Sequence, residues 1–243
     1  MTHFCRAAKS VFVFFGMLLL VSASRAQSRP PIVEQIAKTY GIDSWGQVDA
    51  IRYTFNLQAG PRNASRSWTW EPKADRVSFE GKDKDGKPVK VTYVRSQLGS
   101  QPDNVKKEVD PAFINDSYWM FFPFHVYWDT SADVQDKGMQ KLPTGKGSAK
   151  HIVVKYSSDV GYTPGDTWEL YVGADNRVEE MVFHHGGAAK PSLVKMTWQG
   201  YKKAGPILVS TEHRGTADAK PAHVFFTNVA VKLAGSDNWV DAK

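Results

Sequence analysis

Histidines are the side chains of this sequence that offer general-base or metal-binding chemistry. Beyond residue 26 they are His125, His151, His184, His185, His213 and His223. His184 and His185 are adjacent, so on a strand they point to opposite faces and cannot easily bind one ion together. Glu212 and His213 can approach them if the two strands pair. A hydrolytic or metal-assisted site at these four residues is one hypothesis, and it requires them to converge in one cleft.

The spacing of the other reactive side chains argues against an enzyme. The sequence has no His-Glu-x-x-His pair and no Gly-x-Ser-x-Gly elbow. Its single cysteine, Cys5, precedes the first apolar run, so the segment after residue 26 has no thiol for catalysis, metal binding or disulfides. We therefore expect no catalytic residue, no metal and no cofactor.

The first 26 residues are typical of a secretory signal peptide. Arg6 and Lys9 precede the apolar run 11–21, and Ser24-Arg25-Ala26 places small residues at the −3 and −1 positions. The run is about half of the roughly 20 residues that a spanning helix needs. We expect cleavage after Ala26, a periplasmic or secreted protein, and no transmembrane segment in the mature chain.

Composition predicts one folded domain, residues 27–243, and a monomer. The chain is 42% hydrophobic and has eight tryptophans, which excludes a disordered protein. Its 31 basic residues outnumber its 25 acidic residues, but removal of Arg6, Lys9 and Arg25 lowers the net charge from +6 to +3. This small excess gives no reason to expect nucleic acid as a partner.

Hydrophobic periodicity then predicts the elements. Residues 32–41 have helical spacing and end at a glycine, whereas residues 51–57 begin a strand pattern of period two. Turn residues separate about ten such strands, which lie near 51–57, 66–71, 76–80, 88–95, 152–156, 167–172, 178–184, 193–198, 207–212 and 224–233. The expected fold class is mainly β: a single large, curved antiparallel sheet.

Two central segments differ from the rest. Residues 110–128 are dense in aromatic side chains without alternation, which predicts one or two short helices broken near Pro123. Residues 129–150 are rich in Gly, Lys, Ser and Asp and are expected to form a long polar loop. The N-terminal helix and this central helical insertion are available to cover the concave face of the sheet.

This order of elements resembles the LolA/LolB/RseB-like half-barrel of periplasmic lipoprotein-sorting factors. The similar segments are the opening from Tyr40-Gly41 to Phe55, the Arg66-Ser67-Trp68-Thr69-Trp70 strand, Asn115-Asp116-Ser117-Tyr118-Trp119 with Pro123, and the run 164–171. The resemblance implies a curved sheet, partly covered by helices, whose concave side holds apolar ligands such as acyl chains. It implies no catalytic residues.

Aromatic residues on consecutive strands are the candidate ligand-binding set. Their spacing places each strand's members on one face, with two further rings from the central helix: Tyr53, Phe55, Trp68, Trp70, Phe79, Tyr93, Trp119 and Phe122. The other interpretation, which a single sequence favours, is that these rings form the ordinary core packed under the helices. We expect a non-enzymatic carrier of a lipid or other apolar ligand in the cell envelope. The alternatives are a module that docks an envelope protein and the histidine and glutamate hydrolase.

Overall fold

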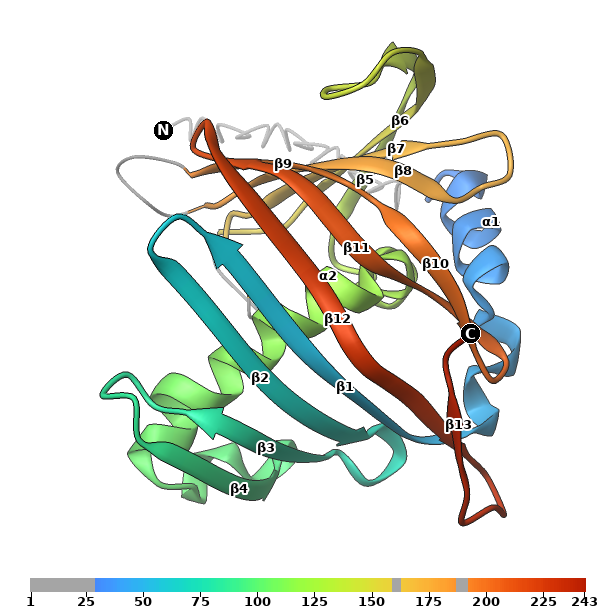
Figure 1. Cartoon of the computed structure of the whole chain (residues 1–243). Coiled ribbons are helices and arrows are strands. Elements are labelled where there is room, and N and C mark those ends of the chain that lie inside the picture. Colours follow the sequence, from blue (N-terminus) through green and yellow to red (C-terminus); the bar gives the residue numbers. More distant parts are fainter. Residues whose placement is uncertain (1–28, 159–162, 187–191) are drawn as a thin grey trace, which may run out of the picture.

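One open antiparallel sheet dominates the protein (Figure 1). The computed structural model describes residues 29–158, 163–186 and 192–243, so the expected signal peptide lies outside the described residues. Within these ranges thirteen strands join in the order β4-β3-β2-β1-β12-β11-β9-β8-β7-β6-β5, while β10 pairs with β11 and β13 with β12. The expected fold class, mainly β with a curved sheet that does not close into a barrel, is confirmed.

The first four strands form a meander, and the last long strands complete this half of the sheet. Strand β12 lies against β1, so residues near both ends of the described chain are neighbours in the sheet. The strands of this half are β1 (Val48–Ala59), β2 (Arg62–Glu71), β3 (Arg76–Lys82), β4 (Pro88–Val94), β11 (Ile207–Ala217), β12 (Lys220–Leu233) and β13 (Trp239–Asp241).

The other half contains a correction to the expected loop. Residues 129–150 are not a loop, because they form all of β5 and the start of β6. Most side chains of β5 are exposed at the free edge of the sheet, so the strand needs no apolar alternation. The strands here are β5 (Asp133–Lys141), β6 (Ser148–Lys155), β7 (Thr167–Val172), β8 (Val178–His184), β9 (Leu193–Thr197) and β10 (Gln199–Ala204).

Helix α1 (Pro31–Tyr40) begins and ends as its sequence predicts. Pro31 occupies the first helical position, where a missing N–H costs nothing. Gly41 ends the helix in the left-handed region, with φ of 97°. The buried side chains Ile32, Val33, Ile36, Ala37 and Tyr40 form the apolar face of this helix.

Helix α2 (Asp110–Trp128) spans 19 residues and is interrupted near Pro123, as expected. The backbone departs from helical angles at Phe121, two residues before the proline, so two helical stretches join across a kink. A π-helical turn, η4 (Val105–Val109), leads into α2. The remaining helical turns are η1 (Ile42–Gln47), η2 (Pro72–Ala74) and η3 (Arg95–Ser100).

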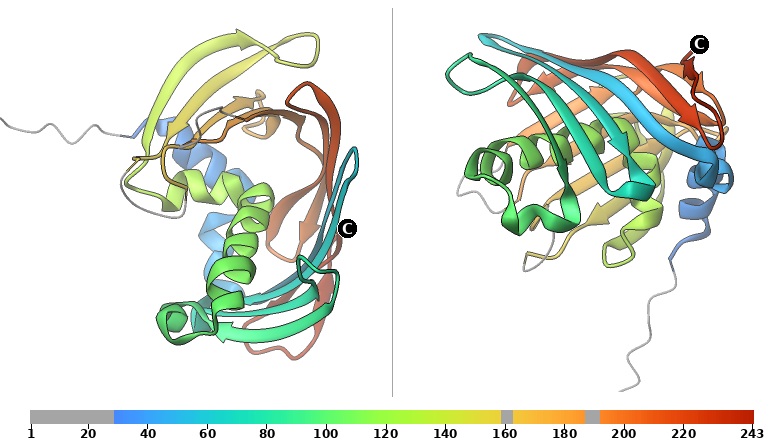
Figure 2. Two further views of the ribbon diagram at one scale, coloured as in Figure 1. Left: turned by 90° about the vertical axis from the view of Figure 1, so that its left-hand side faces the viewer. Right: turned by 90° about the horizontal axis from the view of Figure 1, so that it is seen from below.

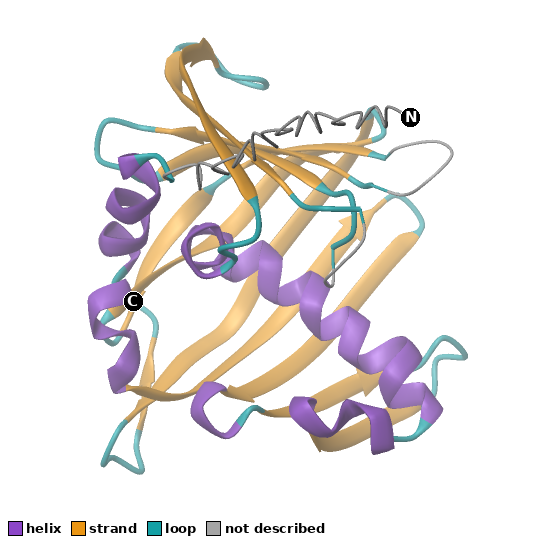
Figure 3. Ribbon diagram, turned by 180° about the vertical axis from the view of Figure 1, so that it is seen from behind, coloured by secondary structure: helices purple, strands orange, loops and turns teal. Residues whose placement is uncertain are grey.

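The sheet curves around α2. The helix crosses the concave face diagonally, and strands lie on more than one side of it (Figures 2 and 3). Because α2 is enclosed in this way, its apolar side chains point in all directions and thirteen of its residues are buried. Among the described residues, no helix is both long and apolar enough to cross a membrane.

Candidate functional site

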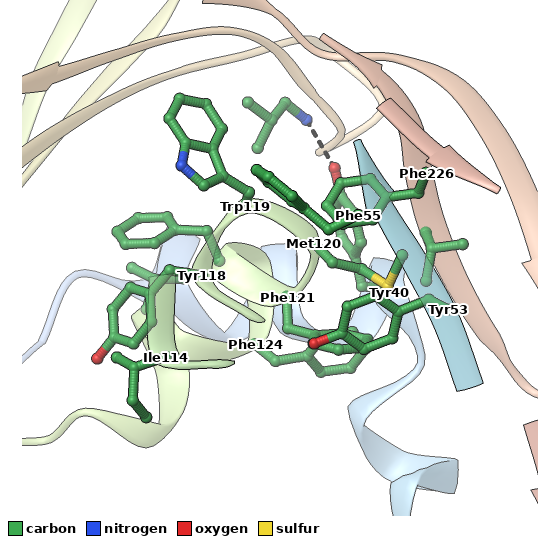
Figure 4. Close-up of a cluster of buried hydrophobic side chains, with 14 of the residues drawn as sticks. Tyr40, Tyr53, Phe55, Ile114, Tyr118, Trp119, Met120, Phe121, Phe124 and Phe226 are labelled. Atoms are coloured by element: carbon green, nitrogen blue, oxygen red, sulfur yellow. Dashed lines mark hydrogen bonds between the residues drawn. The ribbon is translucent and has the colours of Figure 1, made fainter. Parts of the chain in front are cut away.

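The candidate aromatic set lies in the core between the sheet and α2. Tyr53 pairs with Trp68 across β1 and β2, and Trp68 pairs with Phe79 across β2 and β3, so the three rings share the concave face. Phe113 of α2 lies 5.4 Å from Trp68, measured between ring centroids. Figure 4 shows the aromatic side chains gathered around the helix.

Burial is nearly complete for most of this set. The exposed fractions are 1% for Tyr53 and Phe55, 2% for Trp68, 3% for Tyr93, 5% for Phe79, 6% for Trp119 and 0% for Phe122, while Trp70 is half-buried. Trp119 and Phe122 contact the half of the sheet that contains β7, because both pack on Trp168. The structure thus places the set on two sides of α2, and its role in binding a ligand stays a prediction.

A buried carboxylate joins α2 to β2. Asp116 is fully buried and accepts two hydrogen bonds from Arg66, at 2.7 and 2.6 Å. The Trp68 indole N–H donates a third at 2.9 Å, and the Asn115 amide donates a fourth. Burial raises the pKa of Asp116, and the hydrogen bonds and charge of Arg66 oppose this shift.

Carboxylates also hold the two ends of α2. At the start, buried Asp110 accepts hydrogen bonds from the Tyr93 hydroxyl and from Arg95 Nε, at 2.9 and 3.0 Å. Just after the end, Asp129 accepts hydrogen bonds from the hydroxyls of Tyr118 and Tyr156, at 2.8 and 2.7 Å. The helix is therefore fixed to the sheet at its beginning, at Asp116 and beyond its end.

An apolar pocket of about 400 Å³ opens beside the start of α2. It lies between the β3–β4 hairpin and the η4–α2 segment, and its apolar wall consists of Phe79, Val89, Val109 and Ala112. Phe79 is the one member of the candidate aromatic set that lines it. Such a wall suits an alkyl chain.

Charged side chains of both signs also line this pocket: the basic Arg66, Lys82 and Lys84, and the acidic Asp83 and Glu108. Arg66, Lys82 and Lys84 line both the pocket and a wider groove of about 1100 Å³, which lies between the β1–β2 and β3–β4 hairpins. Arg66 already binds Asp116, and Lys84 lies 3.7 Å from a Glu108 oxygen. The two lysines are exposed, so they remain accessible to the polar end of a ligand whose apolar part lies in the pocket.

The residues of the hydrolase hypothesis do not converge. His184 Nε2 lies 2.6 Å from Glu169, whereas Glu212 lies 2.8 Å from His223 Nε2. His185 contacts Asp166 at 3.3 Å, and His213 is buried in the core. Within the described ranges, no group of three or more His, Cys, Asp or Glu side chains is arranged to hold a metal ion.

Several polar atoms of the core have no partner. Among the described residues, no group makes a hydrogen bond to the Tyr53 hydroxyl or to the indole nitrogens of Trp168 and Trp198. A buried polar group without a hydrogen bond costs roughly 1–3 kcal/mol, and native proteins leave few such groups. These atoms are therefore the most unusual feature of the interior.

His213 should make the protein sensitive to acid. Burial lowers the pKa of His213 to about 3 from its usual 6.5. Between pH 6.5 and pH 3 the unfolded chain binds a proton at His213 that the folded chain does not bind. The free energy of unfolding therefore falls by about 1.4 kcal/mol for each pH unit as the pH falls. Between pH 7 and pH 5 the wild type should lose about 2 kcal/mol more than a His213→Phe variant, as measured by urea unfolding. The control is His185→Gln, which changes an exposed histidine. Equal losses of stability in wild type and His213→Phe would contradict the assignment of this pH dependence to His213.

Comparisons with solved structures return distant likenesses that cover most of the chain. A DUF1329 family protein from Desulfovibrio piger has a TM-score of 0.46 and 9% identity over 85% of this chain and 94% of that chain. An outer membrane lipoprotein-sorting protein domain from Vibrio parahaemolyticus has a TM-score of 0.45 and 11% identity over 85% and 94%. The Mycobacterium tuberculosis lipoprotein LppX has a TM-score of 0.31 and 9% identity over 88% and 100%.

No protein-family model and no curated protein matches the chain. The half-barrel resemblance stated from the sequence holds for the architecture, because the order of the strands and the position of α2 show it directly. An architecture of this kind does not determine a ligand or a reaction, which depend on the side chains of the site.

Sequence reasoning missed most of the pocket and all of the carboxylates that fix α2. Val109 lies just before the aromatic segment 110–128 and Ala112 near its start, and neither has a distinctive residue type. A signal for Asp116 was available, because an acidic residue inside an apolar helical segment needs a buried partner. Arg66 was present in the strand that carried the resemblance.

Proposed function

We propose that the protein binds a lipid or other apolar ligand in the cell envelope and carries it between partners without catalysing a reaction. The observation that supports this function is the pocket at the start of α2, which combines an apolar wall with charged side chains, among them three basic ones. An amphiphile fits this arrangement, with its chain against Val89, Val109 and Ala112 and its polar end near Lys82 and Lys84. Burial of the chain contributes about 25 cal/mol per Å².

The proposal includes export of the chain. Cleavage after Ala26 leaves one domain that begins at Gln27 and has no thiol, which suits an oxidising compartment. Native mass spectrometry of the protein purified from the envelope tests two things at once: cleavage after Ala26 and the presence of a bound lipid. The mass should correspond to residues 27–243, and solvent extraction should release a lipid. An uncleaved chain would contradict the location, and a chain without lipid that ignores fatty-acid probes would contradict the function.

Filling the pocket should abolish binding. Ala112 is half-buried on the pocket wall, so an indole introduced by Ala112→Trp would occupy the space of a chain. We expect at least a tenfold loss of affinity for a fluorescent fatty acid, a loss of about 1.4 kcal/mol. Ala74→Trp is the matched control, because Ala74 is exposed in η2 and does not line the pocket. Equal affinity of the two variants would place the ligand elsewhere.

A second candidate function is docking of an envelope protein. Strand β5 lies at the free edge of the sheet, and its Met139 side chain is 64% exposed. A free edge can accept a strand from a partner. An exposed apolar patch near the end of α2 would favour docking, but Phe121, Phe122, Phe124 and Val126 are buried.

A further inference from the structure

The outer face of the first strands, which is turned to the viewer in Figure 1, differs in chemistry from the inner face. Tyr53, Trp68 and Phe79 point inward to α2 and to one another, so their neighbours along each strand point outward. In the middle of β1, β2 and β3 these outward residues carry short hydroxyl side chains: Thr54, Ser67, Thr69 and Ser78. Protein surfaces usually carry many long charged side chains instead.

A groove of about 630 Å³ lies on this outer face. The register places the four hydroxyl residues next to one another, because Thr54 pairs with Ser67 and Thr69 with Ser78. Longer side chains also line the groove: Arg52, Glu80, Lys90, Asn228 and Asp241. Serine and threonine are much shorter than these neighbours, so the face is hollow at the hydroxyls.

The charged side chains of the groove balance one another. Lys90 Nζ lies 3.2 Å from a Glu80 oxygen, and an Arg52 nitrogen lies 3.1 Å from an Asp241 oxygen. The Arg52 guanidinium also lies 4.7 Å from the ring centroid of Trp239, so this side of the groove is held in place by two contacts. Two basic and two acidic residues leave no excess charge to attract a phosphate or a nucleic acid. The groove therefore favours an uncharged ligand.

The hydroxyls can bond to one another and to a ligand at the same time. The side-chain oxygens of Thr54 and Ser67 are 2.9 Å apart, and those of Ser78 and Thr92 are 2.8 Å apart. A hydroxyl has one proton and two lone pairs, so a pair that shares one proton still offers the other proton and further lone pairs. Neighbouring strands repeat this arrangement about every 4.8 Å. A glycan matches such an array, because it carries hydroxyls at regular intervals that both donate and accept.

We propose that this outer groove binds an uncharged oligosaccharide, whose hydroxyls form hydrogen bonds with Thr54, Ser67, Thr69 and Ser78. Binding there holds the protein at a glycan and leaves the inner side of the sheet unchanged. The site goes beyond the proposed function, since Phe79 is the one residue that lines both this groove and the pocket beside α2. Either site can fail without the other.

Isothermal titration calorimetry with three oligosaccharides tests the inference. Wild-type protein should bind at least one of the uncharged probes, cellohexaose and chitohexaose, at least tenfold tighter than a heparin hexasaccharide, which is a polyanion. The double variant Thr69→Val/Ser78→Ala removes two hydroxyls with little change of shape, and it should bind the uncharged probe at least tenfold more weakly. Thr216→Val is the matched control, because Thr216 is half-buried on β11 and does not line the groove. It should keep the wild-type affinity.

Thermal unfolding separates a loss of binding from a loss of structure. The double variant changes side chains on the outer face of the sheet, so it should unfold near the wild-type temperature. Ser67→Arg places a long side chain in the groove from an exposed position and should cause the same loss of binding, which keeps the inference testable if the double variant does not fold.

Three results would overturn the inference: no binding of either uncharged probe, tighter binding of the heparin fragment, or wild-type affinity in both groove variants. Fatty-acid binding distinguishes this site from the pocket beside α2. Ala112→Trp should keep the affinity for the oligosaccharide, and the groove variants should keep the affinity for a fluorescent fatty acid. Loss of oligosaccharide binding in Ala112→Trp would also contradict a site on the outer face.

Discussion

Replacement of Asp116 by alanine is expected to lower the free energy of unfolding by about 3 kcal/mol or more. Asp116 is fully buried and receives hydrogen bonds from Arg66, Trp68 and Asn115. Removal of one member of a buried ion pair typically costs roughly 3–5 kcal/mol, because the remaining charge loses its partner. The Arg66 side chain is 23% exposed, so water can partly replace the carboxylate and the loss should lie near the lower limit.

Urea unfolding of Asp116→Ala and Asp103→Ala measures this difference. Asp103 also binds two cations, Lys106 and Lys107, but its side chain is 68% exposed. Solvent-exposed pairs contribute about 0–1 kcal/mol, so the Asp103 variant should resemble wild type. If Asp116→Ala were no less stable than this control, α2 would not depend on the buried pair for its attachment to β2.

Replacement of Phe122 by alanine should destabilise the protein by about 3–5 kcal/mol, which is the usual cost of deleting a buried phenyl ring. The ring is 0% exposed and stacks on Trp168 at 4.3 Å between centroids. The variant tests whether a predicted ligand-binding residue is a core residue. The structure favours the core, because the ring is fully buried and stacked on Trp168.

Two measurements on Phe122→Ala separate these roles. A lower unfolding temperature with unchanged affinity for a fatty-acid probe, determined on the folded fraction, is the expected result. Tyr127→Ala is the control, since the Tyr127 side chain is 41% exposed on the same helix and its loss should cost little. Weaker binding of the fatty-acid probe with an unchanged unfolding temperature would instead support a ligand-binding role for Phe122.

The local hydrophobic pattern of the sequence was sufficient to predict most strands of the sheet. In β1 the apolar Ile51, Tyr53 and Phe55 alternate with polar residues in the sequence, and all three are buried. The ten predicted strands are all present, and β5, β10 and β13 were missed. The missed strands are short or mostly exposed and bury few side chains. Their sequences therefore show no alternation of apolar and polar residues.

The position of the site depended on tertiary structure. Register places Tyr53, Trp68 and Phe79 side by side, as their spacing predicts, but the path of α2 turns this face into core rather than open surface. The pocket forms where η4 meets the β3–β4 hairpin, a contact between segments with no shared sequence signal.

By itself, then, the sequence determined the fold class, the helix at residues 31–40 and the aromatic composition of the core, because each depends on periodicity and burial within one segment. Tertiary structure alone decided which partners the polar groups obtain. It brought Arg66 to Asp116, separated His184 from His213, and left the indole nitrogens of Trp168 and Trp198 without partners among the described residues. Such pairings depend on how distant elements pack, and side-chain spacing along the chain does not encode them.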